Sequence, residues 1–167
     1  MTEIQWFEDY TGQTTDELIA LEGRYRKDSI VLAFESVLDQ RADKFGPQSL
    51  SQEELVILAI EALEREVNNG GYEQFFINSS YEYSPTIVDA LNRIGCSDAA
   101  AITQDAIDSL GIRGAITIEK VEQIMKEEDE GREEKLGACD DRYFDTIGDL
   151  SEPLFEFIKA NKGNIKC

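Results

Sequence analysis

The stretch from Ser51 to Asn78 constrains the fold more than any other part of the chain. Ser51 can accept a hydrogen bond from first-turn amides, and Glu54, three residues later, completes a capping box. The apolar residues 55–60 fit a strand or a buried helix, but apolar residues then repeat at helical spacing beside glutamates. Because the first two turns are apolar nearly all round, we expect residues 51–69 to form the central buried helix of the fold.

The expected helix ends in the sequence VNNGG at residues 67–71. Asn and Gly tolerate the left-handed conformation that a helix C-cap needs. A second short helix, from Tyr72 to about Asn78, is then expected to bury Phe75 and Phe76. Two interpretations stay open for this corner, a capped turn with aromatic anchors or a ligand pocket lined by amide side chains. The amide side chains are those of Asn68, Asn69 and Gln74.

Helical patterns also cover most of the remaining chain. Thr14 or Thr15, Ser97 and Thr117 can cap helices, and Ser84-Pro85 is typical of an N-cap followed by a first helical residue. The expected helices lie at about 15–21, 30–45, 85–94, 99–110, 117–125, 140–148 and 151–162. No alternating strand pattern of useful length occurs. We therefore predict an all-α fold, a single-domain bundle over 1–167 of about seven to nine helices.

The N-terminal residues 1–13 are expected to form a short ordered arm. Trp6, Phe7 and Tyr10 are too apolar to be left in water. The segment has neither the basic start nor the apolar stretch of a secretory signal, and no stretch of the chain approaches the length of a membrane span. We therefore expect a soluble, cytoplasmic protein with reduced thiols.

Residues 127–138, EEDEGREEKLGA, form the one clear break in composition and are predicted to be a charged loop. Aligning Gly131 with the sixth position of an EF-hand loop places Lys126 and Gly137 at the first and last ligand positions, which excludes an EF-hand. Three interpretations stay open: a solvated loop, a looser cation site, and an acidic element that binds a partner.

The net charge is the unusual feature of the composition. The chain has 35 acidic and 16 basic residues, a formal net charge of −19 and no histidine. Direct binding to nucleic acid is disfavoured, because phosphate contacts require Lys and Arg, and anionic membrane surfaces are excluded on the same grounds. The first 83 residues have a net charge of −11 and the remainder −8, so the acidity belongs to the folded body. The natural partners are basic surfaces or cations.

The residue types that catalysis and metal binding most often use are scarce. Without histidine, the commonest general base and metal ligand is missing. Three cysteines without CxxC spacing indicate no zinc site and no disulfide framework, and no phosphate-binding loop or nucleophile elbow occurs. We expect no metal, no cofactor and no enzymatic activity. A small hydrolase that uses paired carboxylates is kept only as a third hypothesis.

Carboxylates recur at helical spacing in the second half of the chain. If one helix continued through the last third, five of them would lie about 6 Å apart along one face. A shorter stripe lies on the expected helix at 99–110. These stripes either solubilise the surface or present a phosphate-like array to a basic protein. With the acidic segment, the candidate partner-binding residues are Asp98, Asp105, Asp108, Glu127, Glu128, Asp129, Glu130, Asp141, Asp145, Asp149, Glu152 and Glu156.

Residues 64–79, EREVNNGGYEQFFINS, resemble a bacterial family long classed as a domain of unknown function. The shared pattern is a helix ending in VNNGG, then an aromatic residue, QFF and an Asn. Residues 90–107 resemble the Ile-Gly helix junction of that family, with Cys96 where a small residue such as Ala is usual. Residues 140–161 resemble its C-terminal helix pair. The resemblance covers roughly residues 50–162.

The family includes acidic, mostly helical, dimeric DNA mimics, and the resemblance implies what this chain does. It implies a homodimer whose carboxylates imitate phosphates, bind a basic DNA-binding protein such as a helix-turn-helix transcription factor, and block its binding to DNA. An immunity protein that neutralises a basic toxin such as a nuclease is the alternative. The resemblance implies no catalytic residue. The motif residues implied as fold determinants are Val67, Asn68, Asn69, Gly70, Gly71, Gln74, Phe75 and Phe76.

Overall fold

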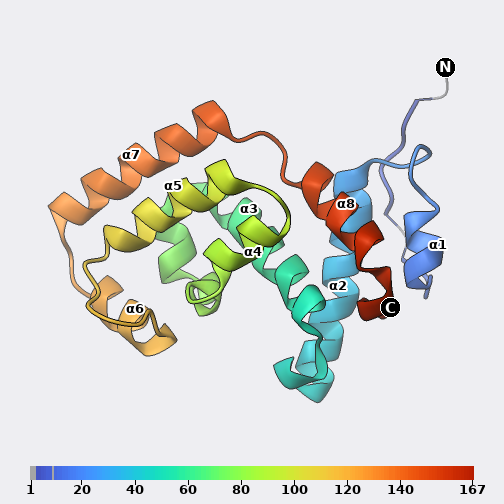
Figure 1. Ribbon diagram of the computed structural model, residues 1–167, viewed down its shortest axis with the longest axis horizontal. Helices are drawn as coiled ribbons and strands as arrows, with labels where there is room; N and C mark the ends of the chain where they lie inside the picture. The colour runs from blue at the N-terminus through green and yellow to red at the C-terminus, as the bar shows by residue number, and fades with distance from the viewer. Residues whose placement is uncertain (1–2, 9) are drawn as a thin grey trace. The chain divides into compact units, whose positions relative to one another are not determined.

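The computed structural model describes residues 3–8 and 10–167, in which all regular structure is helical (Figure 1). Eight α-helices and three short 3₁₀ helices account for it, and only isolated β-bridges occur elsewhere in the described part of the chain. The all-α prediction is confirmed. The chain divides into two compact units, one of residues 1–61 with 149–167 and one of residues 62–148.

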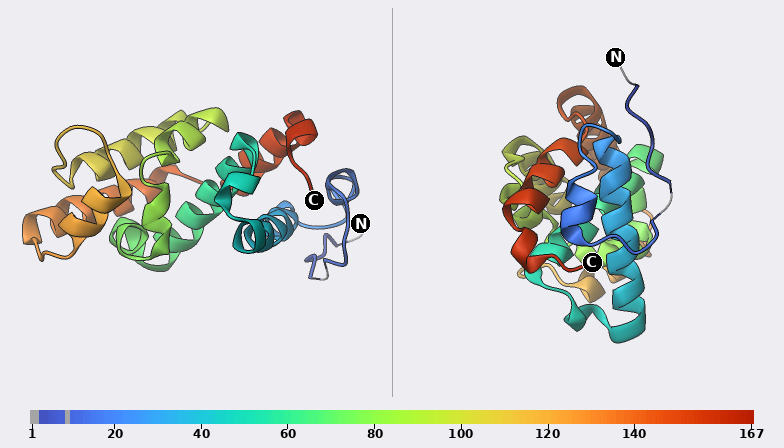
Figure 2. Two further views of the ribbon diagram at one scale, coloured as in Figure 1. Left: turned by 90° about the horizontal axis from the view of Figure 1, so that it is seen from below. Right: turned by 90° about the vertical axis from the view of Figure 1, so that its right-hand side faces the viewer.

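The first unit is built around α2, against which α8 packs (Figure 2). Its elements are α1 (Thr15–Ile19), α2 (Lys27–Phe45), η1 (Pro47–Ser49), the first part of α3 (Gln52–Ile77), α8 (Ser151–Ala160) and η3 (Lys162–Asn164). Apolar side chains at helical spacing form the core, among them Ile30, Phe34 and Leu38 of α2 and Leu154 and Phe155 of α8, all fully buried. Burying each such side chain stabilises the fold by about 1.5–3 kcal/mol.

The capping box at the start of α3 is confirmed. The Ser51 amide donates to Glu54 Oε1 at 3.0 Å, and the Glu54 amide donates to Ser51 Oγ at 3.1 Å. The other Glu54 oxygen forms an ion pair with Arg41 of α2, and Glu54 is only 2% exposed. Arg41 also donates to the Lys166 carbonyl at 2.8 Å. The capping glutamate therefore ties α3 to α2, and Arg41 extends the connection to the last residues of the chain.

The described part of the N-terminal arm is attached to the first unit by its backbone. The Phe7 amide donates to Ser29 Oγ at 3.0 Å, and the Arg26 amide donates to the Gln5 carbonyl at 2.8 Å. Phe7 meets Tyr25 edge to face at 5.3 Å, but Trp6 remains 44% exposed beneath the Arg26 guanidinium. The expectation that Trp6 would be withdrawn from water is wrong, because the cation stacks on its ring instead. Residues 1, 2 and 9 of the expected arm lie outside the described residues.

The second unit contains the family motif. Its elements are the second part of α3, η2 (Ser79–Tyr83), α4 (Ile87–Arg93), α5 (Ser97–Asp108), α6 (Ile118–Met125) and α7 (Glu130–Thr146). Helix α5 lies between α4 and α7 and packs against both (Figure 1). Helix α6 packs on η2. Phe75 and Phe76 are buried where the motif turns, as predicted, and Tyr72 is buried with them.

The corner inside α3 depends on Gly71. Its backbone has φ +82° and ψ −174°, which is not helical, so the segment from Tyr72 onward begins as a new helix with free amides. Asp140 of α7 accepts the Tyr72 amide at 2.7 Å. A Cβ on Gly71 would lie 2.3 Å from Asp140 Oδ2. The glycine is therefore required for its conformation and for the close approach of the capping carboxylate.

Three predicted boundaries are wrong for local reasons. Ser84 does not cap α4, because its amide closes η2 by donating to the Tyr81 carbonyl at 3.0 Å, and α4 begins two residues after Pro85. Ser97 is itself the first residue of α5, following Cys96. The charged loop expected at 127–138 is loop only to Asp129.

Helix α7 begins at Glu130, directly after that shortened loop. The Arg132 amide donates to Asp129 Oδ1 at 3.0 Å, so Asp129 caps the helix. Arg132 and Leu136 then turn inward as the first two members of a buried stripe on α7. Arg132 also donates to the carbonyls of Ile124 and Glu127, which closes the loop onto the end of α6. An unusually charged sequence therefore forms a helix because it has a cap and a narrow buried stripe.

Candidate functional site

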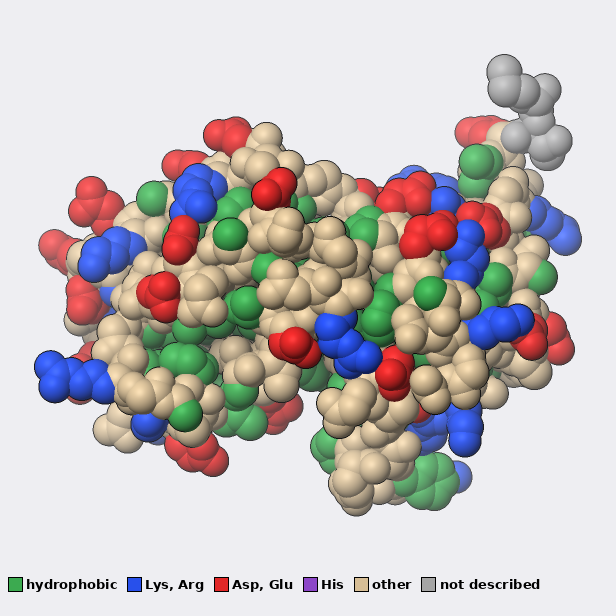
Figure 3. Space-filling model, viewed as in Figure 1, with side chains coloured by type: hydrophobic (Ala, Val, Ile, Leu, Met, Phe, Trp, Pro, Cys, Tyr) green, Lys and Arg blue, Asp and Glu red, His purple; other side chains and the backbone are tan. Residues whose placement is uncertain are grey.

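A row of exposed carboxylates lies on the side of α7 opposite its buried residues. The buried side is formed by Arg132, Leu136, Cys139 and Tyr143. At about 100° per residue, the opposite side holds four exposed acidic residues within an arc of about 60°. These are Glu130, Glu134, Asp141 and Asp145, called the α7 row below. In Figure 3 acidic side chains follow the outer edge of the molecule over α7, with a few cations beside them.

The α7 row has no ion pair or side-chain hydrogen bond with the described residues. The nearby cations on α7, Lys135 and Arg142, lie on its flank, about 100° of helix rotation from Glu134 and Asp141 respectively. Arg142 reaches away to α5, where Nη1 lies 2.6 Å from Asp105 Oδ2. This carboxylate raises the pKa of Arg142. The row therefore presents negative charge that no described residue pairs.

The three aspartates predicted on α5 share its exposed side. Asp98, Asp105 and Asp108 are spaced seven and three residues apart, which repeats the helical period. Asp105 is paired with Arg142, and Asp108 accepts a hydrogen bond from Gln104 Nε2 at 2.9 Å. Of this stripe only Asp98 lacks a side-chain partner among the described residues. The α5 stripe is exposed as expected, but two of its three carboxylates already have partners within the second unit.

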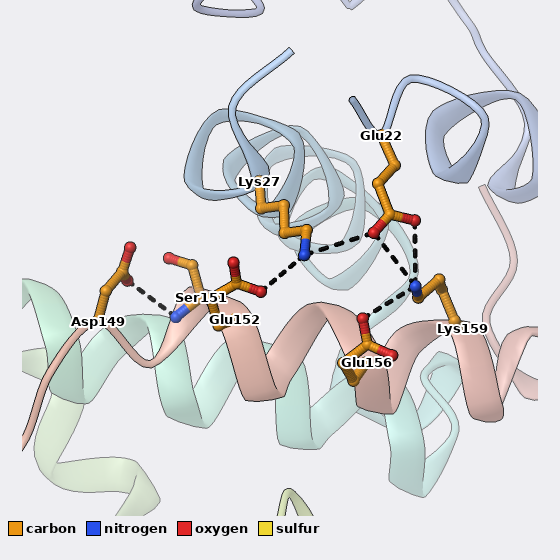
Figure 4. Close-up of polar contacts among 7 residues, drawn as sticks. All are labelled: Glu22, Lys27, Asp149, Ser151, Glu152, Glu156 and Lys159. Carbon is orange, nitrogen blue, oxygen red and sulfur yellow. Dashed lines mark hydrogen bonds and ion pairs between the residues drawn. The ribbon is translucent and has the colours of Figure 1, made fainter. Parts of the chain in front are cut away.

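The carboxylates predicted on α8 are neutralised within the first unit (Figure 4). Lys27 Nζ lies 2.7 Å from Glu152 and 3.4 Å from Glu22, and Lys159 Nζ lies 2.9 Å from Glu156 and 3.0 Å from Glu22. Hydrogen bonds from the Lys159 and Lys27 ammonium groups lower the pKa of Glu22. The hydrogen bonds of Lys159 to Glu156 and Glu22 raise the pKa of Lys159. Both ammonium groups also lie over the Phe155 ring, at 5.9 and 5.4 Å from its centre.

The row of five carboxylates expected along a continuous helix does not form. Helix α7 ends at Thr146 and α8 begins at Ser151, so two residues of the set lie on one helix and two on the other. Asp149, between them, accepts the Ser151 amide at 2.9 Å and stabilises the start of α8. Of the acidic segment, Glu127, Glu128 and Glu130 are exposed, while Asp129 is the cap of α7.

Sequence reasoning misses Glu134 because it places residues 127–138 in a loop. A helical wheel that began at Asp129, an acceptable N-cap, would have placed Glu130, Glu134 and Asp141 on one side and Leu136, Cys139 and Tyr143 on the other. The narrow apolar stripe of this segment indicates a helix, but the many charged residues around it make the stripe difficult to recognise.

The amide-lined pocket considered for the VNNGG corner is not formed. Asn68 and Asn69 are exposed, and the Gln74 side chain folds over Gly70. Inside the corner, the Tyr72 hydroxyl is 2.8 Å from Thr103 Oγ1, and the Tyr143 hydroxyl donates to Glu64. Burial raises the pKa of both tyrosines and of Asp140. The geometry of the corner is that of the capped-turn interpretation, and the role of the motif residues as fold determinants stays a prediction.

No group of three or more potential metal ligands occurs among the described residues, and none of the described helices is long and apolar enough to cross a membrane. Comparison with curated proteins and comparison with solved structures each found no match. A family model described as DMP19-like protein matches residues 48–161, which confirms the resemblance over about 50–162 and shows that the chain belongs to the DMP19-like family.

Proposed function

We propose that this protein is a DNA mimic that uses the α7 row to bind the DNA-binding face of a basic protein and keep it from DNA. Membership of a family named for DNA-mimic protein 19 suggests mimicry in general. The observation that supports this particular face is a helix with four exposed carboxylates on one side and no internal counter-ion within the described residues.

The length of the α7 row suits a partner that normally follows one strand of duplex DNA. From Glu130 to Asp145 the helix rises about 22 Å at 1.5 Å per residue. One DNA strand has a phosphate every 3.4 Å along the axis, or about six over that length. The four carboxylates therefore supply more than half the charge of the strand they would replace. Asp98 and the acidic residues before Asp129 add charge at the edges of the same unit.

The partner we propose is a helix-turn-helix transcription factor, and the mimic acts as a homodimer that offers two α7 rows to a two-fold symmetric regulator. Dimeric regulators of this class contact two half-sites, so a dimeric mimic matches them in symmetry. Electrostatic complementarity mainly raises the association rate and is screened by salt. Binding should therefore weaken steeply as salt rises.

Two variants of equal charge test which face is used. The first neutralises the row with Glu130→Gln, Glu134→Gln, Asp141→Asn and Asp145→Asn. The matched control neutralises four exposed carboxylates elsewhere, with Glu17→Gln, Asp43→Asn, Glu82→Gln and Asp89→Asn. Each protein is used in a low-salt pull-down, and the recovered protein is tested for DNA binding in a mobility-shift assay with added mimic.

We expect the wild type and the control variant to release the captured protein from DNA, and the row variant to fail. Equal loss in both variants would show that net charge alone matters and that the α7 row is not the site. Recovery of a basic nuclease with no DNA-binding regulator would instead support the immunity function.

A further inference from the structure

An exposed aromatic ring lies beside the α7 row. Phe144 is 53% exposed and meets Tyr143 edge to face, with ring centres 6.0 Å apart. On the helix it follows Asp141 by three residues and immediately precedes Asp145, so it lies at the border of the row, about 60° from Asp141. A large apolar side chain in this position lowers solubility and contributes little to the core of its own unit.

Two turns before Phe144, on the same side of α7, the helix surface lacks a side chain. Gly137 lies seven residues before Phe144, two turns along the same side, and a Cβ built there would meet nothing within 4 Å. Glycine within a helix costs about 0.5–1 kcal/mol relative to alanine. Helical side chains lean toward the N-terminus, so the ring of Phe144 lies over the turn of Asp140 and Asp141, on the side from which Gly137 follows one turn further along. No contact within the described unit accounts for this glycine.

We propose that Phe144 and the gap at Gly137 form an apolar anchor site beside the α7 row, and that its occupant is an apolar side chain of a basic amphipathic helix. This inference rests on the proposed function and makes the partner's chemistry more specific. The carboxylate row supplies the charge complementarity that selects a basic partner. The anchor site then distinguishes a protein helix, whose cations alternate with apolar residues, from a simple polycation.

The α7 row and the anchor site have different physical roles in binding. Exposed charge pairs steer association but contribute little net affinity, because both ions lose water on contact. Affinity at protein interfaces is concentrated in a few buried anchors, often aromatic. A surface made only of carboxylates would bind any polycation. Phe144 provides the one large apolar group on the described face of α7, and the gap two turns before it gives a side chain of an incoming helix room to approach the α7 backbone.

Two synthetic peptides of equal charge serve as the probes. Both are lysine- and arginine-rich helices, one with leucines along one side and the other with alanines in their place. Four full-length proteins are compared by titration at several salt concentrations: the wild type, Phe144→Ala, Gly137→Gln and Phe45→Ala. Phe45 is the matched control, because it is 59% exposed and lies in the other unit with the Lys44 ammonium over its ring.

We expect the wild type and Phe45→Ala to bind the leucine peptide about tenfold or more tightly than the alanine peptide. Phe144→Ala and Gly137→Gln should bind both peptides equally, with an unchanged dependence on salt. Gly137→Gln should also be at least as stable as the wild type in denaturant, since glutamine is a good helix former, so lost preference cannot be attributed to unfolding.

Several results would overturn the inference. If salt-dependent binding persists without a leucine preference in the wild type, or the preference survives in Phe144→Ala, the row stands and only the anchor site is lost. If neither peptide binds, or binding ignores salt, the proposed function of the row fails as well. If Phe144→Ala converts a dimer into a monomer in sedimentation, a second copy of the chain covers this ring and the anchor site is refuted.

Discussion

At the scale of single residues, the family motif is explained by conformation and close approach. Gly71 adopts a backbone conformation that only glycine reaches without strain, and Asp140 fills the space where a side chain would begin. The asparagines before it are exposed and cap nothing in the core. VNNGG could be identified from sequence as a corner, but its capping group could not, because Asp140 is 68 positions from Tyr72.

The variant Gly71→Ala should lose about 2–4 kcal/mol of unfolding free energy, from backbone strain and displacement of the Asp140 carboxylate. Urea denaturation measures this loss. The companion variant Gly137→Ala, at an open helical site, should instead gain about 0.5–1 kcal/mol. Similar effects at the two glycines would show that the corner does not depend on Gly71.

The variant Asp140→Asn tests the pH dependence of the same corner. Burial raises the pKa of Asp140 above its usual 3.8, so the stability associated with its protonated form is present below that value and is lost as the pH rises through the folded-state pKa. Asparagine cannot ionise but still offers an oxygen to the Tyr72 amide. Relative to the wild type, Asp140→Asn should therefore gain stability between about pH 3 and pH 7 in urea titrations. A constant difference across this range would refute the assignment.

At the scale of elements, the junction of α2 and α3 depends on a buried ion pair. Removing one partner of such a pair leaves the other charge unpaired in a poorly solvated site. Glu54 is nearly inaccessible, and its partner Arg41 also holds the C-terminal residues through the Lys166 carbonyl. The capping box was predictable because it lies within four residues. The partner on α2 was not.

The variant Arg41→Ala should lose about 3–5 kcal/mol of unfolding free energy, because it leaves Glu54 buried and unpaired. Breaking the exposed pair of Arg26 and Asp28 with Arg26→Ala should cost less than about 1 kcal/mol. Thermal or urea unfolding of both variants gives the comparison. If Arg41→Ala were no more costly than Arg26→Ala, Glu54 would have to be solvated in the folded protein.

At the scale of the whole molecule, the net charge of −19 acts on folding and on binding in opposite directions. Self-repulsion among the carboxylates destabilises the compact state, while under the proposed function their field attracts a basic partner. Only some of the acidic surface is free for that role. The α8 carboxylates are matched by Lys27 and Lys159, whereas the α7 row is not matched by any described residue.

Added sodium chloride, from about 0.02 M to about 0.3 M, should therefore raise the melting temperature and lower the affinity for the basic peptides, because both effects arise from screening of the same charge. Calorimetry and titration over one salt series measure the two quantities. A melting temperature that falls with salt would show that internal ion pairs outweigh self-repulsion. Only the titrations with the basic peptides would then test the function of the α7 row.

The amino-acid sequence by itself determined the helical class, the capping box, the turn at VNNGG and the family. These depend on hydrogen bonds within a few residues and on helical periodicity, both of which adjacent side chains specify. The tertiary structure alone decided which carboxylates remain free, because Lys27 is 125 positions from Glu152 and Arg142 is 37 from Asp105. Packing decides which charges form ion pairs, because the attraction between two charges depends on their distance in space and not on their separation along the chain.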